Sequence, residues 1–324
     1  MDHRDLPPIS VVIPVFGRED VFKTLGLLKT TDYFGRLRIV VVDNGNAEPL
    51  AARLHQTEAG NVYVARMGEN RGGSGGYIAG VSYAMKHHCD TRYIWLLDDD
   101  AVPNVETLPE LYATFQELLE AGKRVASVGS VEVRLEDPDI ILECGADFSF
   151  ATDIKCRLQN ESLMASANLT LKVTYTSGAS GLLSKTAIED CGFWDDVFIH
   201  YDDVEWGVRT TRMGYENFAT TRSVVRHPAV GAISSSRRWI SYYDTYNFLW
   251  ICARYYKLGF LKTLTHALML DVWHLYFRCV PNHDVYPMLA RRDFLRGKRR
   301  LRAEMEMCAR LLADELKSKG RLRG

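Results

Sequence analysis

Short apolar runs alternate with helix-length segments along the first part of the chain. The apolar runs are rich in β-branched residues, have the length of strands, and cover residues 9–16, 37–43, 62–67, 93–97 and 125–133. Helical patterns lie between them at residues 19–28, 47–59, 76–88 and 105–121. Strands and helices that alternate at this spacing predict an α/β fold with a doubly wound, mostly parallel sheet.

The pattern changes in the later part of the chain. Between residue 140 and about residue 176, short alternating segments such as LTLKVTYTS predict an antiparallel addition to the sheet. From residue 236 to residue 324 the pattern is helical, with helices expected near residues 239–256, 260–280 and 286–319. We therefore expect an α/β sheet structure followed by a helical C-terminal region.

Three consecutive carboxylates, Asp98, Asp99 and Asp100, follow the apolar run at residues 93–97. Because side chains alternate along an extended segment, Asp98 and Asp100 should point the same way. Two neighbouring carboxylates repel each other unless a cation lies between them, and Mg2+ or Mn2+ binds such oxygens while leaving positions for phosphate groups. The run predicts a metal and diphosphate site, with a solvated acidic turn as the alternative.

Other polar or small residues fall at the same edge of the predicted sheet. Ligands of doubly wound sheets bind beyond the carboxyl ends of the strands, where Pro14, Asp43 and Asn70 are expected. Asp43 fits either hydrogen bonding to a nucleoside or capping of a turn. The glycine-rich loop GENRGGSGG at residues 68–76 leads into a helix and suits close approach to phosphate or sugar, although it is neither a GxGxxG nor a P-loop motif.

A second informative stretch, GFWDDVFIHYDDVEWGVR, covers residues 192–209. Asp202 and Asp203 stand just before a helical pattern, where amides of the first turn would hold a general base for a sugar hydroxyl; capping of the helix explains only one of them. The aromatic Trp194 suits either a sugar ring or the core. His227, at a strand end, fits either a neutral metal ligand or a structural histidine.

Composition and charge narrow the class of protein. The net charge of -1 over 324 residues gives no support to a nucleic-acid partner. Seven cysteines without a CxxC pair, and a start without a signal-peptide pattern, fit a cytoplasmic protein with reduced thiols.

Charged and histidine residues interrupt the apolar stretch at 260–280, which argues against a spanning helix. The cationic strip RRDFLRGKRRLR, at residues 291–302, fits contact with an anionic membrane surface or a solvated face packed on the rest of the protein.

The motifs VVIPVF, VVVDNG, the glycine loop, LLDDDA and FIHYDDVEWGVR, in that order, resemble the inverting glycosyltransferases of family 2, which have the GT-A fold. The resemblance covers roughly residues 9–256. Within the family the chain looks most like bacterial galactofuranosyltransferases, on NRGGSGGY, the DDD triplet, YDDVEWGVRTTRMGY, the strand-ending histidine and SYYDTYNFL. It departs from the wider family at Asp202, where Glu is common, which leaves the base open between Asp202 and Asp203.

Carried over to this sequence, the resemblance implies a role for each candidate residue. Asp203 would be the general base with Asp202 beside it, and Mn2+ or Mg2+ would be held by Asp98, Asp100 and His227. The acceptor would lie near Trp194, Gly178 and Tyr201. The nucleotide sugar would be bound by a larger set: Pro14, Asp43, Asn70, Arg71, Gly75, Gly76, Asp98 and Asp99.

The resemblance also implies a domain plan and an activity. Residues 1–235 would form the catalytic domain, with a nucleotide-sugar half at 1–103 and an acceptor half at 104–235, and residues 236–324 a helical region. The expected reaction moves galactofuranose from UDP-galactofuranose to a lipid-linked or polysaccharide acceptor of bacterial surface glycan synthesis, at the inner face of the cytoplasmic membrane. The alternatives are a rhamnosyltransferase or another UDP-sugar transferase, a non-catalytic nucleotide-sugar-binding protein, and a nucleotidyltransferase.

Overall fold

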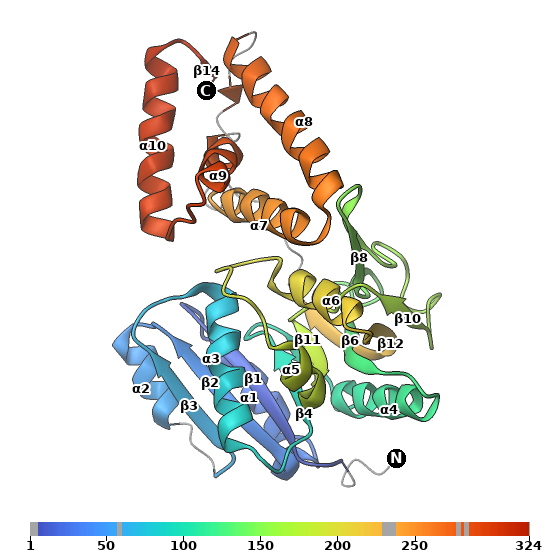
Figure 1. Cartoon of the computed structure of the whole chain (residues 1–324). Coiled ribbons are helices and arrows are strands. Elements are labelled where there is room, and N and C mark those ends of the chain that lie inside the picture. Colours follow the sequence, from blue (N-terminus) through green and yellow to red (C-terminus); the bar gives the residue numbers. More distant parts are fainter. Residues whose placement is uncertain (1–5, 57–59, 229–237, 277–279, 282–284, 324) are drawn as a thin grey trace. The chain divides into compact units, whose positions relative to one another are not determined.

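The computed structural model describes residues 6–56, 60–228, 238–276, 280–281 and 285–323 (Figure 1). Its internal contacts divide the chain into two compact units. The first comprises Met1–Phe148, Ile154–Phe198 and Asp202–Ala229, and the second comprises Ser149–Asp153, Ile199–Tyr201 and Val230–Gly324. The boundary expected at residue 235 lies outside the described residues.

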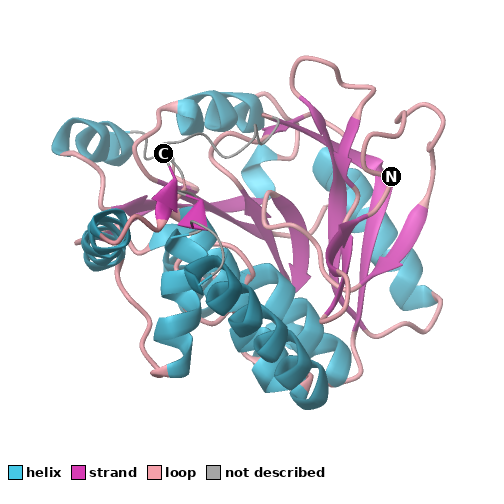
Figure 2. Cartoon of the chain, turned by 90° about the horizontal axis from the view of Figure 1, so that it is seen from above, coloured by secondary structure: helices cyan, strands magenta, loops and turns pink. Residues whose placement is uncertain are grey.

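A ten-stranded sheet forms the centre of the first unit (Figure 2). Its main strand order is β10-β12-β6-β11-β4-β1-β2-β3, with β5 paired to β12 and β7 paired to β6. The β1–β2, β2–β3, β1–β4 and β12–β6 pairs are parallel, whereas β11 runs antiparallel between β4 and β6. The predicted fold class, a mostly parallel sheet with antiparallel additions and a helical C-terminal region, is confirmed.

The strand bounds agree with the apolar runs to within one residue at most ends. The sheet contains β1 (Ile9–Val15), β2 (Leu37–Asn44), β3 (Val62–Met67), β4 (Tyr93–Leu97), β5 (Val102–Pro103), β6 (Val125–Arg134), β7 (Ile141–Glu143), β10 (Thr170–Val173), β11 (Ser180–Ser184) and β12 (Glu216–His227). Two short pairs lie apart from it: β8 (Ala146–Ser149) with β9 (Asp153–Cys156), and β13 (Val280–Pro281) with β14 (Leu322–Arg323).

Helices cover both faces of the sheet, so its central strands are buried on both sides. One core joins Ile9, Val11 and Ile13 of β1 to α1 (Asp20–Lys29), α2 (Glu48–Gln56) and α4 (Thr107–Glu120). The other joins Val12 of β1 to α3 (Gly72–His87), α5 (Lys185–Cys191) and α6 (Asp202–Arg212). Burial on both faces explains why these strands are continuous apolar runs.

The glycine-rich stretch is not only a loop, because α3 begins at Gly72 rather than near Gly76. A β-carbon on Gly76 would lie 2.8 Å from Pro14 Cβ, and one on Gly80 would lie 2.3 Å from Val12 Cγ1. Gly72 has a φ of +73° and packs against the Phe198 carbonyl. The glycines therefore let the helix approach β1 closely, a packing reason that the sequence pattern does not separate from ligand binding.

The second unit is helical where it is described. It contains α7 (Ile240–Tyr255), α8 (Lys257–Tyr276), α9 (Val285–Leu295) and α10 (Arg302–Ser318), so the helical stretch expected at 286–319 is interrupted around Gly297, whose φ is +62°. None of the helices in the described residues has the length and apolar character needed to cross a membrane.

Several cations of the strip at residues 291–302 form ion pairs inside the second unit. Arg291 Nε lies 2.7 Å from Asp271 Oδ2, and the Arg300 guanidinium pairs with the fully buried Asp293. Arg302 pairs with Glu306 within α10. These partners neutralise much of the strip, so its charge in the sequence overstates the charge available to a surface.

We expect Gly80→Ala to destabilise the first unit by about 1–3 kcal/mol, because the added methyl would overlap Val12 in a closely packed core. Gly73→Ala, in the same helix, is the matched control. No atom lies within 4 Å of a β-carbon at Gly73, so stability should be unchanged or up to about 1 kcal/mol higher. Urea unfolding measures both, and equal effects would contradict the packing argument.

Candidate active site

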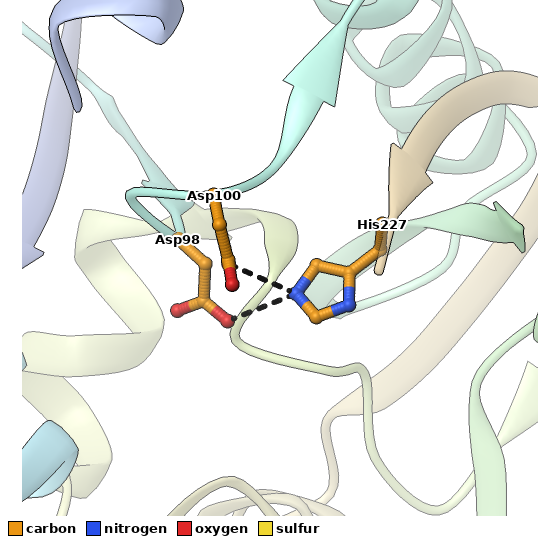
Figure 3. A group of neighbouring side chains, drawn as sticks. All are labelled: Asp98, Asp100 and His227. Carbon is orange, nitrogen blue, oxygen red and sulfur yellow. Dashed lines mark ion pairs between the residues drawn. The ribbon is translucent and has the colours of Figure 1, made fainter. Parts of the chain in front are cut away.

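The turn after β4 and the end of β12 bring three potential metal ligands together, although these strands are not neighbours in the sheet. After the acidic turn the chain forms β5, which pairs with Val225 and Arg226 of β12. His227 Nε2 consequently lies 3.2 Å from Asp100 Oδ1 and 3.7 Å from Asp98 Oδ2 (Figure 3). One ligand atom from each of these three residues lies within 4.8 Å of the others.

The tautomer of His227 suits a metal ligand. Its Nδ1 lies 3.0 Å from the Pro228 carbonyl and donates to it, which leaves the Nε2 lone pair of a neutral imidazole facing the carboxylates. Burial lowers the pKa of His227, but the neighbouring carboxylates of Asp100 and Asp98 outweigh it and raise the pKa to about 11. At neutral pH the Nε2 atom of His227 therefore carries a proton, which lies where a metal cation would bind. A ligand set of two carboxylates and one imidazole fits Mn2+ or Mg2+.

Further side chains orient the acidic turn. The Tyr77 hydroxyl lies 2.6 Å from Asp98 Oδ1 and 2.9 Å from the Gly178 carbonyl, with one proton to donate. Arg18 pairs with Asp100, and its Nη1 lies 3.8 Å from Asp99 Oδ1. Burial and the charge of Asp100 raise the pKa of Asp99 to about 7, against the opposing effect of Arg18. Asp99 therefore lies beside an arginine, apart from the three-residue cluster.

The candidates for nucleotide binding form a hydrogen-bonded corner at the ends of β1, β2 and β3. Asp43 Oδ1 accepts from the Asn46 backbone and side chain, at 3.0 and 2.7 Å, so this oxygen caps the turn. Its Oδ2 is buried and accepts no hydrogen bond from the described residues. The turn interpretation of Asp43 holds for Oδ1, whereas Oδ2 lies 3.9 Å from Arg66 Nε.

The remaining residues of this corner hold the start of α3. Asn70 Oδ1 accepts from the Gly72 amide at 2.8 Å, while Arg71 forms an ion pair with Asp196. Asn44, which sequence reasoning did not single out, donates to the Gly72 carbonyl at 2.8 Å. Pro14 and Arg71 are also the nearest neighbours of Gly76 and Gly75 respectively.

Asp202 and Asp203 are the first two residues of α6. The sequence pattern had placed both of them just before the helix. Asp203 Oδ1 accepts from the Val204 amide at 2.7 Å, and Asp202 Oδ1 accepts from the Asp203 amide at 3.2 Å. Removal from water, then the charges of Asp202 and Glu143, raise the pKa of Asp203 well above its ordinary value; hydrogen bonds from Val204 and Gly178 oppose them. A raised pKa suits a carboxylate that must accept a proton near neutral pH.

Gly178 connects the two acidic stretches. Its carbonyl lies 2.9 Å from the Tyr77 hydroxyl that contacts Asp98, and its amide is close enough to Asp203 to lower the pKa of that carboxyl. Trp194 packs on the same residue, because a β-carbon at Gly178 would lie 2.9 Å from Trp194 Cη2. The first unit therefore brings the metal candidates, the acid pair, Gly178 and Trp194 into one site.

Two of the aromatic candidates have structural contacts. Trp194 is mostly buried, stacks on Phe193 at 5.0 Å between ring centroids, and meets Tyr77 edge-on at 5.1 Å. Its indole Nε1 is buried and donates to no acceptor in the part of the chain that the structure describes. Tyr201 belongs to the second unit, where its hydroxyl donates to Asp153 at 2.9 Å.

Two glutamates that sequence reasoning missed, the buried Glu132 and the half-buried Glu143, lie at this site. Glu132 of β6 and Glu143 of β7 face each other across an antiparallel pair. Burial raises the pKa of both carboxyls, to about 8 for Glu143, and Glu132 acts electrostatically on His227. The signal in the sequence was weak, because one acid inside the apolar run VASVGSVEVR does not form a motif.

A family model described as glycosyltransferase like family 2 matches residues 7–251. The chain belongs to this family. The match includes both acidic stretches and His227. The chain therefore carries a glycosyltransferase region of the family 2 type, whose donor and acceptor the match leaves open.

Curated relatives and solved structures agree with the family. The poly-beta-1,6-N-acetyl-D-glucosamine synthase of Staphylococcus aureus strain MSSA476 is 23% identical over 242 residues, which make up 72% of this chain and 54% of that protein. The poly-beta-1,6-N-acetyl-D-glucosamine synthase of strain COL is 24% identical over 227 residues, which make up 68% of this chain and 50% of that protein. The chain thus spans about half the length of the curated relatives it matches.

Solved structures show a GT-A-like fold. GalNAc-T7 with UDP, GalNAc and Mn2+ has a TM-score of 0.56 at 14% identity, covering 77% of this chain and 48% of that chain. The mannosyltransferase PcManGT of Pyrobaculum calidifontis, with GDP-Man and Mn2+, has a TM-score of 0.53 at 17% identity, covering 96% and 82%. At these identities the likeness concerns the fold alone.

Proposed function

We propose that this family 2 glycosyltransferase transfers galactofuranose from UDP-galactofuranose, with inversion, to a lipid-linked or polysaccharide acceptor in bacterial surface glycan synthesis. The observation that carries the site assignment is the connection through Gly178 between the Asp98–Asp100–His227 cluster and Asp203. The motifs NRGGSGGY, DDD and YDDVEWGVRTTRMGY support the sugar. The names of the similar proteins refer to different sugars and favour none.

The proposed donor site combines the Asp98–Asp100–His227 cluster with the hydrogen-bonded residues around Asp43 at the ends of β1, β2 and β3. Asp98, Asp100 and His227 would hold Mn2+ or Mg2+, which when bound offsets negative charge on the departing nucleoside diphosphate. Asp43 Oδ2, which is buried and 3.9 Å from Arg66 Nε but accepts no hydrogen bond from the described residues, would accept from the nucleoside. Pro14, Asn70, Arg71, Gly75, Gly76 and Asp99 would complete this side of the site.

The proposed transfer needs one base. Asp203 would take the proton from the acceptor hydroxyl as its oxygen attacks the anomeric carbon on the face opposite the leaving group. The bond to the diphosphate oxygen breaks in the same displacement, so the anomeric configuration inverts. Trp194 and Gly178 are the proposed acceptor side, and the Trp194 indole, which donates to no acceptor among the described residues, offers a donor to a sugar oxygen.

UDP release from a panel of nucleotide sugars tests the donor. UDP-galactofuranose should give metal-dependent release with Mn2+ or Mg2+ and none with EDTA, and Asp100→Ala should lose UDP affinity in the presence of Mn2+. Glu136→Ala, at an exposed carboxylate outside the site, is the control. Release from dTDP-rhamnose or another UDP-sugar alone would refute the galactofuranose assignment, and unchanged UDP affinity of Asp100→Ala would refute the metal site.

Asp203→Asn should keep UDP binding and lower transfer by about 10²–10⁴-fold, because the amide cannot accept the hydroxyl proton. With the wild type, transfer should rise with pH through the raised pKa of Asp203, since only the deprotonated form is a base; the variant should lack this limb. Rate measurements between pH 5 and pH 9 check both. If Asp202→Asn shows the loss instead, the base is Asp202. Transfer that survives both substitutions would contradict the role of the acid pair.

The proposal includes a peripheral position on the inner face of the cytoplasmic membrane. Large apolar side chains of α8 are exposed, with Leu261, Met269 and Val272 each more than half accessible. Spacings of eight and eleven residues place all three on one helix face, which suits insertion among lipid headgroups. This face is a better candidate than the cationic strip, because four of the seven cations of the strip form ion pairs within the second unit.

The double variant Leu261→Asp, Met269→Asp should lose most of its flotation with anionic phosphatidylglycerol liposomes, because two charges would enter the apolar boundary. Met164→Asp, at an apolar side chain of the first unit that is 84% exposed, controls for the added charge. Equal flotation of the wild type and the double variant would exclude α8 as the contact.

A further inference from the structure

Each of the two aspartates in the metal cluster has one oxygen engaged by another side chain of the first unit. The Tyr77 hydroxyl lies 2.6 Å from Asp98 Oδ1 and 2.9 Å from the Gly178 carbonyl. Its single proton goes to the carboxylate, because a hydrogen bond to a charged acceptor is shorter and stronger than one to a neutral carbonyl. The Arg18 guanidinium pairs with Asp100 Oδ2. One oxygen of each carboxylate is therefore already occupied.

The other oxygen of each aspartate faces His227. Asp98 Oδ2 lies 3.7 Å from His227 Nε2, and Asp100 Oδ1 lies 3.2 Å from it (Figure 3). Because a hydrogen-bond donor competes with a cation for the same oxygen, each aspartate offers a cation one oxygen rather than two. The cluster thus presents one ligand atom from each of its three residues.

The surroundings of Tyr77 hold its hydroxyl at Asp98. Tyr77 belongs to α3, is only 4% exposed, and meets the ring of Trp194 edge-on with 5.1 Å between the ring centroids. Gly178 also packs against it, since a β-carbon at Gly178 would lie 3.6 Å from Tyr77 Cε2. A ring packed in this way cannot follow a rotation of the carboxylate, so Asp98 loses the hydrogen bond if it turns Oδ1 toward a cation.

Divalent cations differ in how many carboxylate oxygens they need. Ca2+ takes about six to eight oxygen ligands and often binds carboxylates through both oxygens. Mg2+ requires a nearly octahedral shell and keeps positions for water and substrate phosphates, and Mn2+ accepts the same geometry. With three ligand atoms from the protein, an octahedral ion keeps about three positions for phosphate oxygens and water. The larger Ca2+ shell is left short of ligands.

We infer that Tyr77 and Arg18 are positioning residues that set the metal selectivity of this site, in favour of Mn2+ and Mg2+ over Ca2+. By holding one oxygen of each aspartate, they prevent Ca2+ from binding either carboxylate through both oxygens. The inference rests on the proposed metal site and adds to it the residues that decide which cation the site accepts.

The ratio of the Ca2+ dissociation constant to the Mn2+ dissociation constant tests the inference in the full-length protein with UDP present. Electron paramagnetic resonance of free Mn2+ measures Mn2+ binding, and displacement of Mn2+ measures Ca2+ binding. Tyr77→Phe keeps the ring and removes the hydroxyl, so Mn2+ should bind about 10–100-fold more weakly. Ca2+ affinity should stay the same or rise, because both oxygens of Asp98 become available, so the ratio should fall at least about tenfold.

Tyr215→Phe is the matched control for this variant. The Tyr215 hydroxyl also donates to an aspartate at 2.6 Å, but that aspartate is Asp190, which is not part of the metal cluster. Both dissociation constants should stay unchanged.

Arg18→Met decides the test if Tyr77→Phe does not fold, since the Arg18 side chain is 41% exposed. Loss of its positive charge should strengthen the binding of both cations. Release of Asp100 Oδ2 should favour Ca2+ further, so the ratio should fall about 3–10-fold. Arg53→Met, which removes the exposed ion pair with Glu19, is the control and should leave the ratio unchanged.

A purely structural role would change both dissociation constants by the same factor and leave the ratio unchanged, which would overturn the inference. Equal affinity of the wild type for Ca2+ and Mn2+ would overturn it as well. Failure of the wild type to bind Mn2+, or unchanged Mn2+ affinity of Asp100→Ala, would overturn the proposed metal site and this inference together. Loss of Mn2+ in Asp100→Ala with an unchanged ratio in Tyr77→Phe would overturn the inference alone.

Discussion

Repulsion among three consecutive carboxylates is the constraint that shapes the site of this protein. Asp98, Asp99 and Asp100 follow a fully buried strand, and the side chains of Asp99 and Asp100 are only 11% and 13% exposed, so water screens these two poorly. Positive charge has to come from the protein or from a bound ion, and it arrives from Arg18 on one side and His227 on the other. The return of the chain as β5 against β12 is what brings His227 within reach.

The sequence predicts most of the sheet because its strands are buried on both faces. A run such as ISVVIPV can pack nowhere else, so its length and its place in the chain determine the strand. Asp98 and Asp100 are two residues apart at the end of such a strand, so the sequence also predicts that their side chains point the same way. Helix starts are less certain: α3 begins at Gly72 because glycine is needed there for close packing, which lowers the helical signal of the same residues.

Residues of the site that lack a local pattern escaped prediction. Tyr77 lies in a helix and reaches Asp98 only because α3 packs against β1. Glu132 and Glu143 meet across an antiparallel pair, and nothing in either segment alone indicates that meeting. The left-handed backbone before Asp202 is also invisible in the sequence, since Phe198, His200 and Tyr201 are residues that ordinarily avoid positive φ values.

The pairing of β12 with β6 has a consequence for how the chain can vary in length. Between Thr220 and Val224 the register shifts, so that three residues of β12 bulge out between consecutive partners Ser130 and Val131. Side chains alternate along a strand, and an odd insertion or deletion downstream of this bulge would turn His227 to the opposite face. Surface loops tolerate changes of length. The residues from Val224 to His227 pair without interruption with Val131 to Arg134, so their number sets the face of the sheet to which His227 points.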